Sequence, residues 1–235
     1  MNTMYEVNVS GTKNVYEAAR KNEVHFFCHL SSVGVIGKTN QPVVDEDAPC
    51  APMNIYERSK LEAERIVECG IKGCSIVILR PTNVFAEDTF DIRRYRGVHG
   101  TLRVWFTGKE RSHLVYAGDV AEAGAFLLES WIQPGCQKFI VSSDEEPDHT
   151  NVEVYESVQR LLGYWVERRR WVCPLGLVYY LRLLRHGRGN RGDVCYSARR
   201  LLSTGFKMPF GLLEGIRRSV ECSQRKQKVA APERK

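Results

Sequence analysis

A tyrosine and a lysine four residues apart, Tyr56 and Lys60, have the spacing and the chemistry of an acid–base pair. The apolar pattern around them predicts a helix over residues 52–68, which would place both side chains on one face, one turn apart. A free tyrosine has a pKa of about 10 and is a poor acid or base at neutral pH. A neighbouring ammonium favours the phenolate and lowers that pKa. Alone the pair is a weak signal, because chance helical matches are common.

A serine pair precedes this helix at the end of a short apolar run. Residues 24–30 are predicted to form a buried strand, and Ser31 and Ser32 follow it directly. Ligands bind at the carboxyl ends of the strands in open α/β sheets. A hydroxyl there can hydrogen-bond a substrate oxygen that gains or loses a proton. The alternative interpretation is a loop serine that caps backbone groups.

The elements that must position these residues alternate between strand and helix patterns, which predicts an α/β fold with a mainly parallel sheet. Helices are expected over residues 7–21, 52–68, 120–130, 151–162, 177–185 and 210–222, and strands over 24–30, 75–79, 102–106, 113–116 and 138–142. The first helix has Val7, Val15, Ala18 and Ala19 as its candidates for burial. Asp119 is the expected N-cap of the helix over residues 120–130.

Composition is that of an ordinary globular protein. The chain has 235 residues, of which 43% are hydrophobic and 26% charged. No apolar run is long enough to cross a membrane and the start lacks a signal-peptide core, so a cytoplasmic protein is expected. The eight cysteines form no CxxC pair and show no zinc spacing, so reduced thiols and no metal site are expected.

The net charge of +6 is concentrated towards the C-terminus. Seven arginines crowd one stretch: Arg168, Arg169, Arg170, Arg182, Arg185, Arg188 and Arg191. They are interpreted either as a solvated surface or as a positively charged entrance to the site of a phosphate-bearing substrate. Nucleic-acid binding is not expected, since no known module accompanies the charge. The apolar stretch Val172–Leu184 is interpreted as a buried lobe helix in preference to a membrane-surface helix, so membrane association is not expected.

Five ordered segments resemble the extended short-chain dehydrogenases/reductases of the NAD-dependent epimerase/dehydratase family. HLSSVGVIG followed by YERSK resembles the family's Ser…Tyr-x-x-x-Lys core. The other four segments are VNVSGTKNVYEAARKNEVHFF, ILRPTNVF, SHLVYAGDVAEA and YSARRLLSTGFKMPFGLLEGIRRSVE. The resemblance implies a Rossmann-like domain over residues 1–145, a small interleaved substrate lobe over 146–224 and a basic disordered tail over 225–235.

The resemblance also implies a role for each matched residue. Tyr56 would be the general acid/base, Ser32 would polarise the substrate oxygen, and Lys60 would lower the tyrosine's pKa and bind the cofactor ribose. Residues expected to border NAD or NADP are Asn8, Leu30, Ser31, Tyr56, Lys60, Pro81, Asn83 and Val84; those expected to border the substrate are Ser32, Asn83 and His113. Arg80 is equally compatible with a role near the substrate and with a strand-end ion pair to a carboxylate. Asn83 and His113 have structural interpretations, as a turn cap and a strand-start residue.

The resemblance implies an NAD(P)-dependent oxidoreductase or epimerase that acts on a hydroxyl or carbonyl carbon, preferentially of a nucleotide sugar. Val33 and Gly34 stand where the family's sugar dehydratases carry an Asp-Glu pair, so 4,6-dehydration is not expected. A sterol- or 3-beta-hydroxysteroid-type dehydrogenase is the alternative, favoured by the apolar stretch at 172–184. A non-catalytic relic of the fold is the second alternative. The resemblance alone implies a homodimer.

The sequence departs from the family at the nucleotide site. It contains no G-x-G-x-x-G motif between a strand and a helix, the motif whose backbone approaches the pyrophosphate. On the order of 80 residues, about three βα units, are therefore expected to be missing from the start of the fold. A fragment of a longer chain, a truncated inactive product and a chain completed by a partner all fit this pattern. The choice between NAD and NADP stays open.

Overall fold

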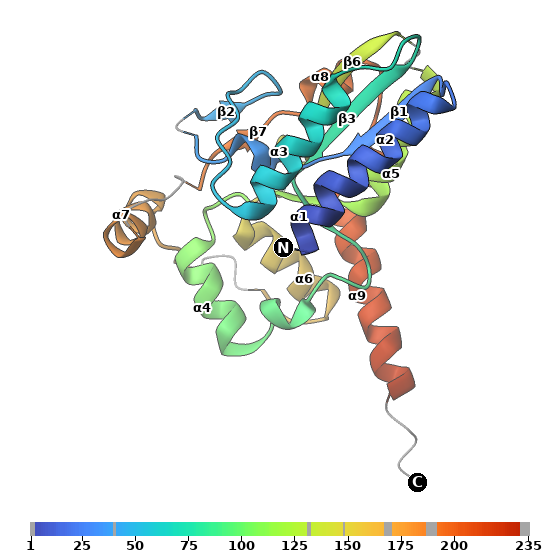
Figure 1. Ribbon diagram of the computed structural model, residues 1–235. Helices are drawn as coiled ribbons and strands as arrows, with labels where there is room; N and C mark the ends of the chain where they lie inside the picture. The colour runs from blue at the N-terminus through green and yellow to red at the C-terminus, as the bar shows by residue number, and fades with distance from the viewer. Residues whose placement is uncertain are drawn as a thin grey trace. The chain divides into compact units, whose positions relative to one another are not determined.

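The computed structural model describes residues 3–39, 41–130, 133–147, 149–166, 171–186 and 192–230 (Figure 1). The chain divides into two compact units, each assembled from separate stretches. Unit 1 comprises residues 1–82, 120–142 and 196–208, and unit 2 comprises residues 83–119, 143–195 and 209–235. The α/β class expected from the sequence is confirmed. The domain boundaries expected at residues 145 and 224 remain predictions, and the two units interleave along the chain.

Unit 1 is built on a parallel sheet of three strands in the order β1-β3-β6. These strands are β1 (Phe26–Leu30), β3 (Ser75–Pro81) and β6 (Gly135–Val141). All residues of the central strand β3 are buried, as expected where helices cover both faces of a parallel sheet. The last residue of β1, Leu30, pairs with Leu79, so β1 ends close to the end of β3.

Helices cover both faces of this sheet (Figure 1). On one face, α2 (Gly11–Lys21) and α3 (Ile55–Glu68) pack through Tyr16 and Val67 against Ile76 and Ile78 of β3. On the other face, α5 (Ala117–Ser130) lies so close that a Cβ at Gly124 would meet the Leu79 side chain at 3.7 Å. The catalytic candidates Tyr56 and Lys60 therefore lie on a helix that packs directly on the sheet.

The first helical run differs from expectation. It comprises α1 (Thr3–Tyr5), a π-helical turn (Glu6–Ser10) and α2. Val7 and Val15 are 66% and 61% exposed, so their predicted burial is wrong, as it is for the exposed Ala18. The predicted burial of Ala19 is confirmed, and Val9 and Tyr16 are buried as well; Tyr16 and Ala19 pack with residues of α3 and the sheet. Apolar side chains are common on protein surfaces, so type alone did not fix the face.

The remaining short elements of unit 1 are a 3₁₀ helix (Val33–Ile36), β2 (Val43–Val44) and α8 (Arg199–Ser203). The two-residue strand β7 (Cys195–Tyr196) lies where the chain passes from one unit to the other.

Unit 2 has a two-stranded parallel sheet, β4 (Asn83–Phe85) and β5 (Leu114–Tyr116), and a set of helices. The helical elements are a 3₁₀ helix (Ile92–Tyr95), α4 (Gly97–Thr107), α6 (Asn151–Leu161), α7 (Leu175–His186) and α9 (Gly211–Ala230). Their core is rich in aromatic residues. It contains Phe85, Phe90, Tyr95, Tyr116, Val154, Val158, Leu212 and Ile216.

Three expectations for unit 2 are corrected. Residues 102–106, expected as a strand, lie in α4, because a short apolar run does not distinguish strand from helix. Asp119 lies inside α5 and does not cap that helix; its carboxylate accepts the backbone N–H groups of Phe210 and Gly211 at the start of α9. α9 continues to Ala230, so residues 225–230 of the expected disordered tail are helical, and 231–235 lie outside the described residues.

The interpretation of the apolar stretch at residues 172–184 as a buried lobe helix is also wrong. In α7, Leu177, Tyr180, Leu181 and Leu184 are 50%, 63%, 47% and 83% exposed. Their spacing of i, i+3, i+4 and i+7 places them on one helical face, which is open to solvent.

Candidate active site

The start of α3 fixes the position of Tyr56. Asn54 is the N-cap, and its side chain accepts the backbone N–H of Glu57 at 2.9 Å. Glu57 in turn accepts the backbone N–H groups of Met53 and Asn54, which completes a capping box. Tyr56 therefore lies in the first turn of a well-capped helix, and its side chain is 40% exposed. A phenolate at this position gains from the positive end of the helix dipole.

Lys60 lies one turn further along α3 and joins that helix to β1. Its ammonium donates to the carbonyl oxygen of Leu30 at 3.0 Å and lies 6.0 Å from the centre of the Tyr56 ring. Burial lowers the pKa of Lys60 below its usual value, while the charge of Glu64 acts in the opposite direction. The hydrogen bond holds the Tyr56–Lys60 pair at the carboxyl end of β1, the edge where α/β sheets bind ligands.

Ser32 begins the 3₁₀ helix that follows β1. Its Oγ accepts the backbone N–H of Gly34 at 3.1 Å, so the capping role is present in the structure. Accepting that bond uses a lone pair and leaves the hydroxyl proton available for donation, so capping and substrate contact are compatible. A Cβ at Gly34 would lie 3.1 Å from the Glu57 side chain. The Ser32 loop therefore passes close to the start of α3.

Two buried hydroxyl groups at the same edge are open to a further hydrogen bond. Ser31 follows β1 and is 3% exposed, and Thr82 follows β3 and is 6% exposed. Among the described residues, neither the Ser31 Oγ nor the Thr82 Oγ1 has a hydrogen-bond partner in the protein. Buried hydroxyl groups nearly always have a partner, which is a water or a ligand when no protein group supplies it.

A buried ion pair fixes α3 on the sheet. The Arg80 guanidinium makes two hydrogen bonds to the Glu64 carboxylate, at 2.7 and 3.0 Å, and both side chains are 0% exposed. Burial alone would lower the pKa of Arg80, but its bonds to Glu64 raise the pKa above the usual value. The ion-pair interpretation of Arg80 is thus the one that the structure supports.

Sequence reasoning missed Glu64. The signal was present, since Glu64 lies four residues after Lys60 on the same helical face. Its pairing depends on the register between α3 and β3, which no local pattern specifies.

The other expected cofactor contacts lie in different places. Asn8 donates to the Ser59 hydroxyl at 2.9 Å, and Ser59 donates to the Tyr56 carbonyl, so Asn8 supports the turn that carries Tyr56. Leu30 is 50% exposed, and Pro81 is the last residue of β3. Asn83 and Val84 belong to β4 of unit 2. The structure thus brings Leu30, Tyr56 and Lys60 together in unit 1.

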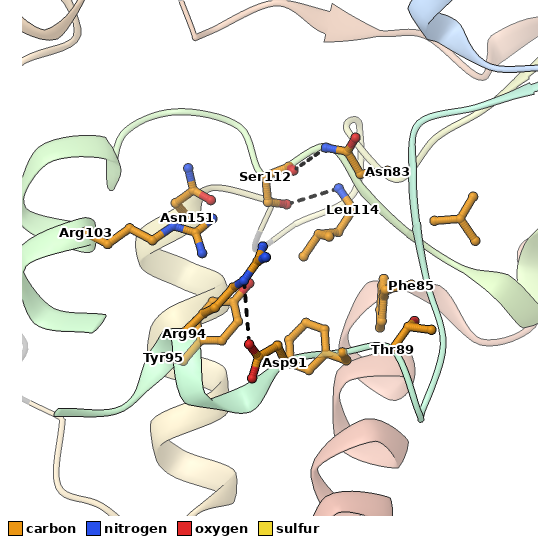
Figure 2. Close-up of a pocket in the computed structure, with 12 residues that line it drawn as sticks. Asn83, Phe85, Thr89, Asp91, Arg94, Tyr95, Arg103, Ser112, Leu114 and Asn151 are labelled. Atoms are coloured by element: carbon orange, nitrogen blue, oxygen red, sulfur yellow. Dashed lines mark hydrogen bonds and ion pairs between the residues drawn. The ribbon is translucent and has the colours of Figure 1, made fainter. Parts of the chain in front are cut away.

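Unit 2 contains a pocket of about 430 Å³ (Figure 2). Its lining residues are Asn83, Val84, Phe85, Thr89, Phe90, Asp91, Arg94, Tyr95, Arg103, Ser112, Leu114 and Asn151. Figure 2 shows the Arg94 and Arg103 side chains on one side and the Phe85 ring on the other. The Arg103 guanidinium lies over the Tyr95 ring, 5.7 Å from its centre. Two guanidinium groups beside aromatic rings suit a ligand that joins phosphate to a ring system.

Of the residues that line this pocket, sequence reasoning placed only Asn83 and Val84 near a ligand, and it assigned no structure to residues 86–100. The arginines of IRRYR were the available signal for Arg94. His113, an expected substrate contact, does not line this pocket, although its neighbours Ser112 and Leu114 do. Its Nδ1 lies 2.8 Å from an Asp144 carboxylate oxygen. That contact favours the structural interpretation of His113.

The C-terminal arginines are only partly described. Arg168, Arg169, Arg170, Arg188 and Arg191 lie outside the described residues, as does the side chain of Arg185. Arg182 forms a two-pronged ion pair with Glu110, with N···O distances of 2.6 and 2.8 Å. Among the described residues, no cluster of three His, Cys, Asp or Glu side chains could hold a metal ion, and no helix is long and apolar enough to cross a membrane.

Known proteins share the sequence and the fold. A sequence model of the NAD dependent epimerase/dehydratase family matches residues 1–136. An Escherichia coli O157:H7 protein named N-acetyl-alpha-D-glucosaminyl-diphospho-ditrans,octacis-undecaprenol 4-epimerase is 27% identical, over 92% of this chain and 71% of its own length. A putative UDP-glucose 4-epimerase of Methanocaldococcus jannaschii is 26% identical, over 92% of this chain and 68% of its own.

The fold is similar to that of a Bordetella bronchiseptica enzyme whose crystal structure contains NAD+. The TM-score is 0.66 with 22% identity, and the match covers 92% of this chain and 68% of the other. At this identity the likeness shows the fold.

Proposed function

The chain belongs to the NAD-dependent epimerase/dehydratase family, and from that premise we propose that its site oxidises and reduces a hydroxyl-bearing carbon of a sugar. The sugar would be carried on a diphosphate, preferentially as a nucleotide sugar. The names of the two relatives describe sugars joined to a nucleoside diphosphate or to a polyprenyl diphosphate. The diphosphate is the chemistry that both share.

One observation carries the proposal. The Lys60 ammonium donates a hydrogen bond to the Leu30 carbonyl, and this places the Tyr56–Lys60 pair at the carboxyl edge of the sheet, where α/β proteins bind ligands. The Tyr56 phenolate would take the proton from the substrate hydroxyl as the carbon is oxidised, and the tyrosine hydroxyl so formed would return it on reduction. The Lys60 charge and the α3 N-terminus both favour the phenolate that this transfer requires. Ser32 would donate its hydroxyl proton to the same substrate oxygen.

The residues of unit 1 fit the nicotinamide half of NAD. Lys60 uses one of its three N–H donors on Leu30 and keeps two for ribose hydroxyls. The Ser31 and Thr82 hydroxyls offer further bonds at that edge. When bound, the nicotinamide supplies the acceptor and donor of hydride. The sequence contains no glycine-rich pyrophosphate motif, so the proposal assigns this chain's residues to the nicotinamide and its ribose.

Unit 2, considered by itself, offers a pocket with groups that can bind phosphate. Arg94 and Arg103 would bind phosphate oxygens, and the Phe85 and Tyr95 rings would border a base or a sugar. Val33 and Gly34 carry no acid or base beside Ser32, which favours epimerisation or oxidation over dehydration. Two carboxyl groups there would be needed to remove water from the neighbouring carbon.

The test is a substrate panel with NAD: UDP-glucose, UDP-N-acetylglucosamine, a polyprenyl-diphosphate-linked N-acetylglucosamine and a 3-beta-hydroxysteroid. We expect turnover of a sugar diphosphate, and a loss of about 10²–10⁴-fold in kcat for Tyr56→Phe with NAD affinity unchanged. Tyr164→Phe, which removes an exposed hydroxyl bonded to Arg96, is the matched control and should keep full activity.

The panel separates the alternatives. Turnover of the steroid alone would assign a sterol-type dehydrogenase. Full activity of Tyr56→Phe would remove the acid–base role. Absence of both turnover and calorimetric NAD binding, in this chain and in a version extended upstream in frame, would identify a non-catalytic relic of the fold.

A further inference from the structure

The unit 2 pocket has one acidic side chain among its cationic and aromatic lining residues. This residue, Asp91, precedes the 3₁₀ helix Ile92–Tyr95 and lines the pocket together with two arginines and three aromatic residues. A carboxylate repels phosphate, so a pocket that served phosphate alone would bind it better without the acid. The carboxylate therefore needs a role of its own, either in the fold or toward another part of the ligand.

The two oxygens of the Asp91 carboxylate have different surroundings. Oδ1 accepts the backbone N–H of Arg93 at 3.1 Å and the Arg93 Nε–H at 2.9 Å, so it caps the 3₁₀ helix. Oδ2 lies 3.8 Å from the Arg94 Nε, which is an ion-pair contact but too long for a hydrogen bond. The bonds from Arg93 lower the pKa of Asp91 below its usual value, so the group is ionised and only accepts hydrogen bonds. The cap thus accounts for Oδ1 and leaves Oδ2 as an acceptor beside Arg94.

The aromatic lining places this acceptor between two kinds of surface. The Phe90 ring stacks on the Tyr95 ring with centres 5.2 Å apart, and it packs on the Phe85 ring at 5.2 Å. Figure 2 shows Arg94 joined to Asp91, with Tyr95 on one side of the carboxylate and Phe85 on the other. A ligand with its ring system at the aromatic residues and its phosphate at Arg94 would set the group between those two parts against Oδ2.

In a nucleotide, the group between the base and the phosphate is a ribose, whose hydroxyl groups donate hydrogen bonds. A carboxylate is the usual acceptor for a ribose hydroxyl in dinucleotide-binding folds. The carrier chain of a polyprenyl diphosphate has no hydroxyl group, so it would leave Oδ2 without a donor beside a ligand phosphate. The position of Oδ2 therefore favours a ribonucleoside diphosphate over a polyprenyl diphosphate.

We propose that Asp91 is a specificity-determining residue that accepts a hydrogen bond from a ribose hydroxyl of the nucleotide carrier while Arg94 binds the adjacent phosphate. This inference rests on the proposed function, whose sugar diphosphate it narrows to a sugar joined to a ribonucleoside diphosphate. It concerns unit 2 alone, so nucleotide binding can be measured without NAD and without turnover.

The experiment is calorimetric titration of the full chain, without NAD, with UDP, CDP, ADP, GDP and pyrophosphate. The nucleoside diphosphate that binds most tightly is then compared with its 2′-deoxy and 3′-deoxy analogues. We expect it to bind at least about tenfold more tightly than pyrophosphate, and at least about tenfold more tightly than one of the two analogues.

Asp91→Asn separates the proposed contact from the helix cap. The amide keeps Oδ1 as the cap and replaces Oδ2 by an NH₂ group, which cannot accept a hydrogen bond. The affinity ratio between the ribonucleotide and that analogue should fall from about tenfold to below about threefold, whatever the lost charge does to both affinities. Asp88→Asn is the matched control, because Asp88 is an exposed acid of the same loop that does not line the pocket. Its ratio should equal that of the unaltered chain.

Equal affinity for the ribonucleotide and both analogues, or an unchanged ratio in Asp91→Asn, would overturn the proposal. So would a sugar nucleotide whose binding depends on Asp91 when that of the free nucleotide does not, which would assign Oδ2 to the sugar. Failure of every nucleoside diphosphate to bind more tightly than pyrophosphate would also overturn it, and turnover of the polyprenyl-linked sugar would then leave the proposed function standing. An Asp91-dependent ratio without turnover of any sugar would uphold the ribose contact and refute the proposed reaction.

Discussion

Each unit contains one conspicuous departure from the usual distribution of polar and apolar groups, and the two departures are of opposite kinds. Unit 1 buries charge: the Arg80–Glu64 pair is fully enclosed beneath the helix that carries Tyr56 and Lys60. Unit 2 exposes apolar side chains: Leu184 is 83% exposed on a helix held by an ion pair on its other side. Each departure costs free energy. The comparison indicates that the first fixes on the sheet the helix that carries Tyr56 and Lys60, and that the second leaves an apolar helical face open to solvent.

The largest effect expected from this comparison is in unit 1. Glu64→Gln leaves the Arg80 charge buried without a carboxylate and should destabilise the fold by about 3–5 kcal/mol, measured by urea unfolding. The double variant Glu64→Leu, Arg80→Met removes both charges and should recover most of that loss. Glu214→Gln removes a carboxylate from exposed ion pairs with Arg217 and Arg218, and it should leave the midpoint of urea unfolding unchanged. Equal effects at Glu64 and Glu214 would refute the distinction between the buried and the exposed ion pairs.

A second effect in unit 1 depends on pH. Burial lowers the pKa of His29 to about 4, and the nearby Lys60 charge acts in the same direction. The unfolded chain therefore binds a proton at His29 that the folded chain does not, so stability is lost as the pH falls from about 6.5 towards 4. The loss has an upper value of about 3 kcal/mol. His29→Phe should flatten this part of the stability profile; an unchanged profile would show that His29 does not cause it.

Sequence reasoning worked best where local signals agree. The extents of β1, β3 and α3 were predicted to within a few residues, because apolar runs and helix-terminating residues mark them. Tyr56, Lys60 and Ser32 were singled out because the segments around them resemble the family's Ser…Tyr-x-x-x-Lys core, and their catalytic roles stay predictions. The Arg80–Glu64 contact was not predictable, since it depends on how α3 registers on β3.

Unit 2 was less predictable for the same physical reason. Residues 102–106 fit either a strand or a helix, and the pocket residues Arg94 and Arg103 come from separate elements that only tertiary packing brings together. The pattern of α7 gave its amphipathic stripe correctly. Which way the stripe turned was decided by the Arg182–Glu110 pair, 72 residues apart in sequence.

A smaller effect is expected at the Asp119 carboxylate in unit 2. It accepts the backbone N–H groups of Phe210 and Gly211 at 2.9 and 3.0 Å and is 0% exposed. Asp119→Ala should cost about 0.5–2 kcal/mol, the usual cost of a lost helix cap, and speed hydrogen exchange at the first amides of α9. Asp119→Asn keeps an acceptor and should lose less. If the two variants lose the same amount, the carboxylate does not act as a cap.

A glycine-to-alanine change should alter the free energy of unfolding with opposite signs at two helical positions, Gly124 in α5 and Gly215 in α9. In α5, a Cβ at Gly124 would meet Leu79 and Cys28 at 3.7 and 3.9 Å, which is ordinary contact. Gly124→Ala should therefore stabilise the fold by about 0.5–1 kcal/mol through the lower entropy of the unfolded chain. In α9, a Cβ at Gly215 would lie 2.7 Å from the buried Tyr116 ring, so Gly215→Ala should destabilise by about 1–3 kcal/mol.

Thermal and urea unfolding of the two glycine variants, measured side by side, give the sign directly. Helix propensity favours alanine equally at both positions, so a difference in sign reports packing alone. A gain at Gly215 would mean that the Tyr116 ring moves aside at little cost and that the core of unit 2 is loosely packed. A loss of stability in Gly124→Ala would mean that the contact between α5 and the sheet is too close for a methyl group. The close packing that supports Tyr56 and Lys60 would then extend to both faces of the unit 1 sheet.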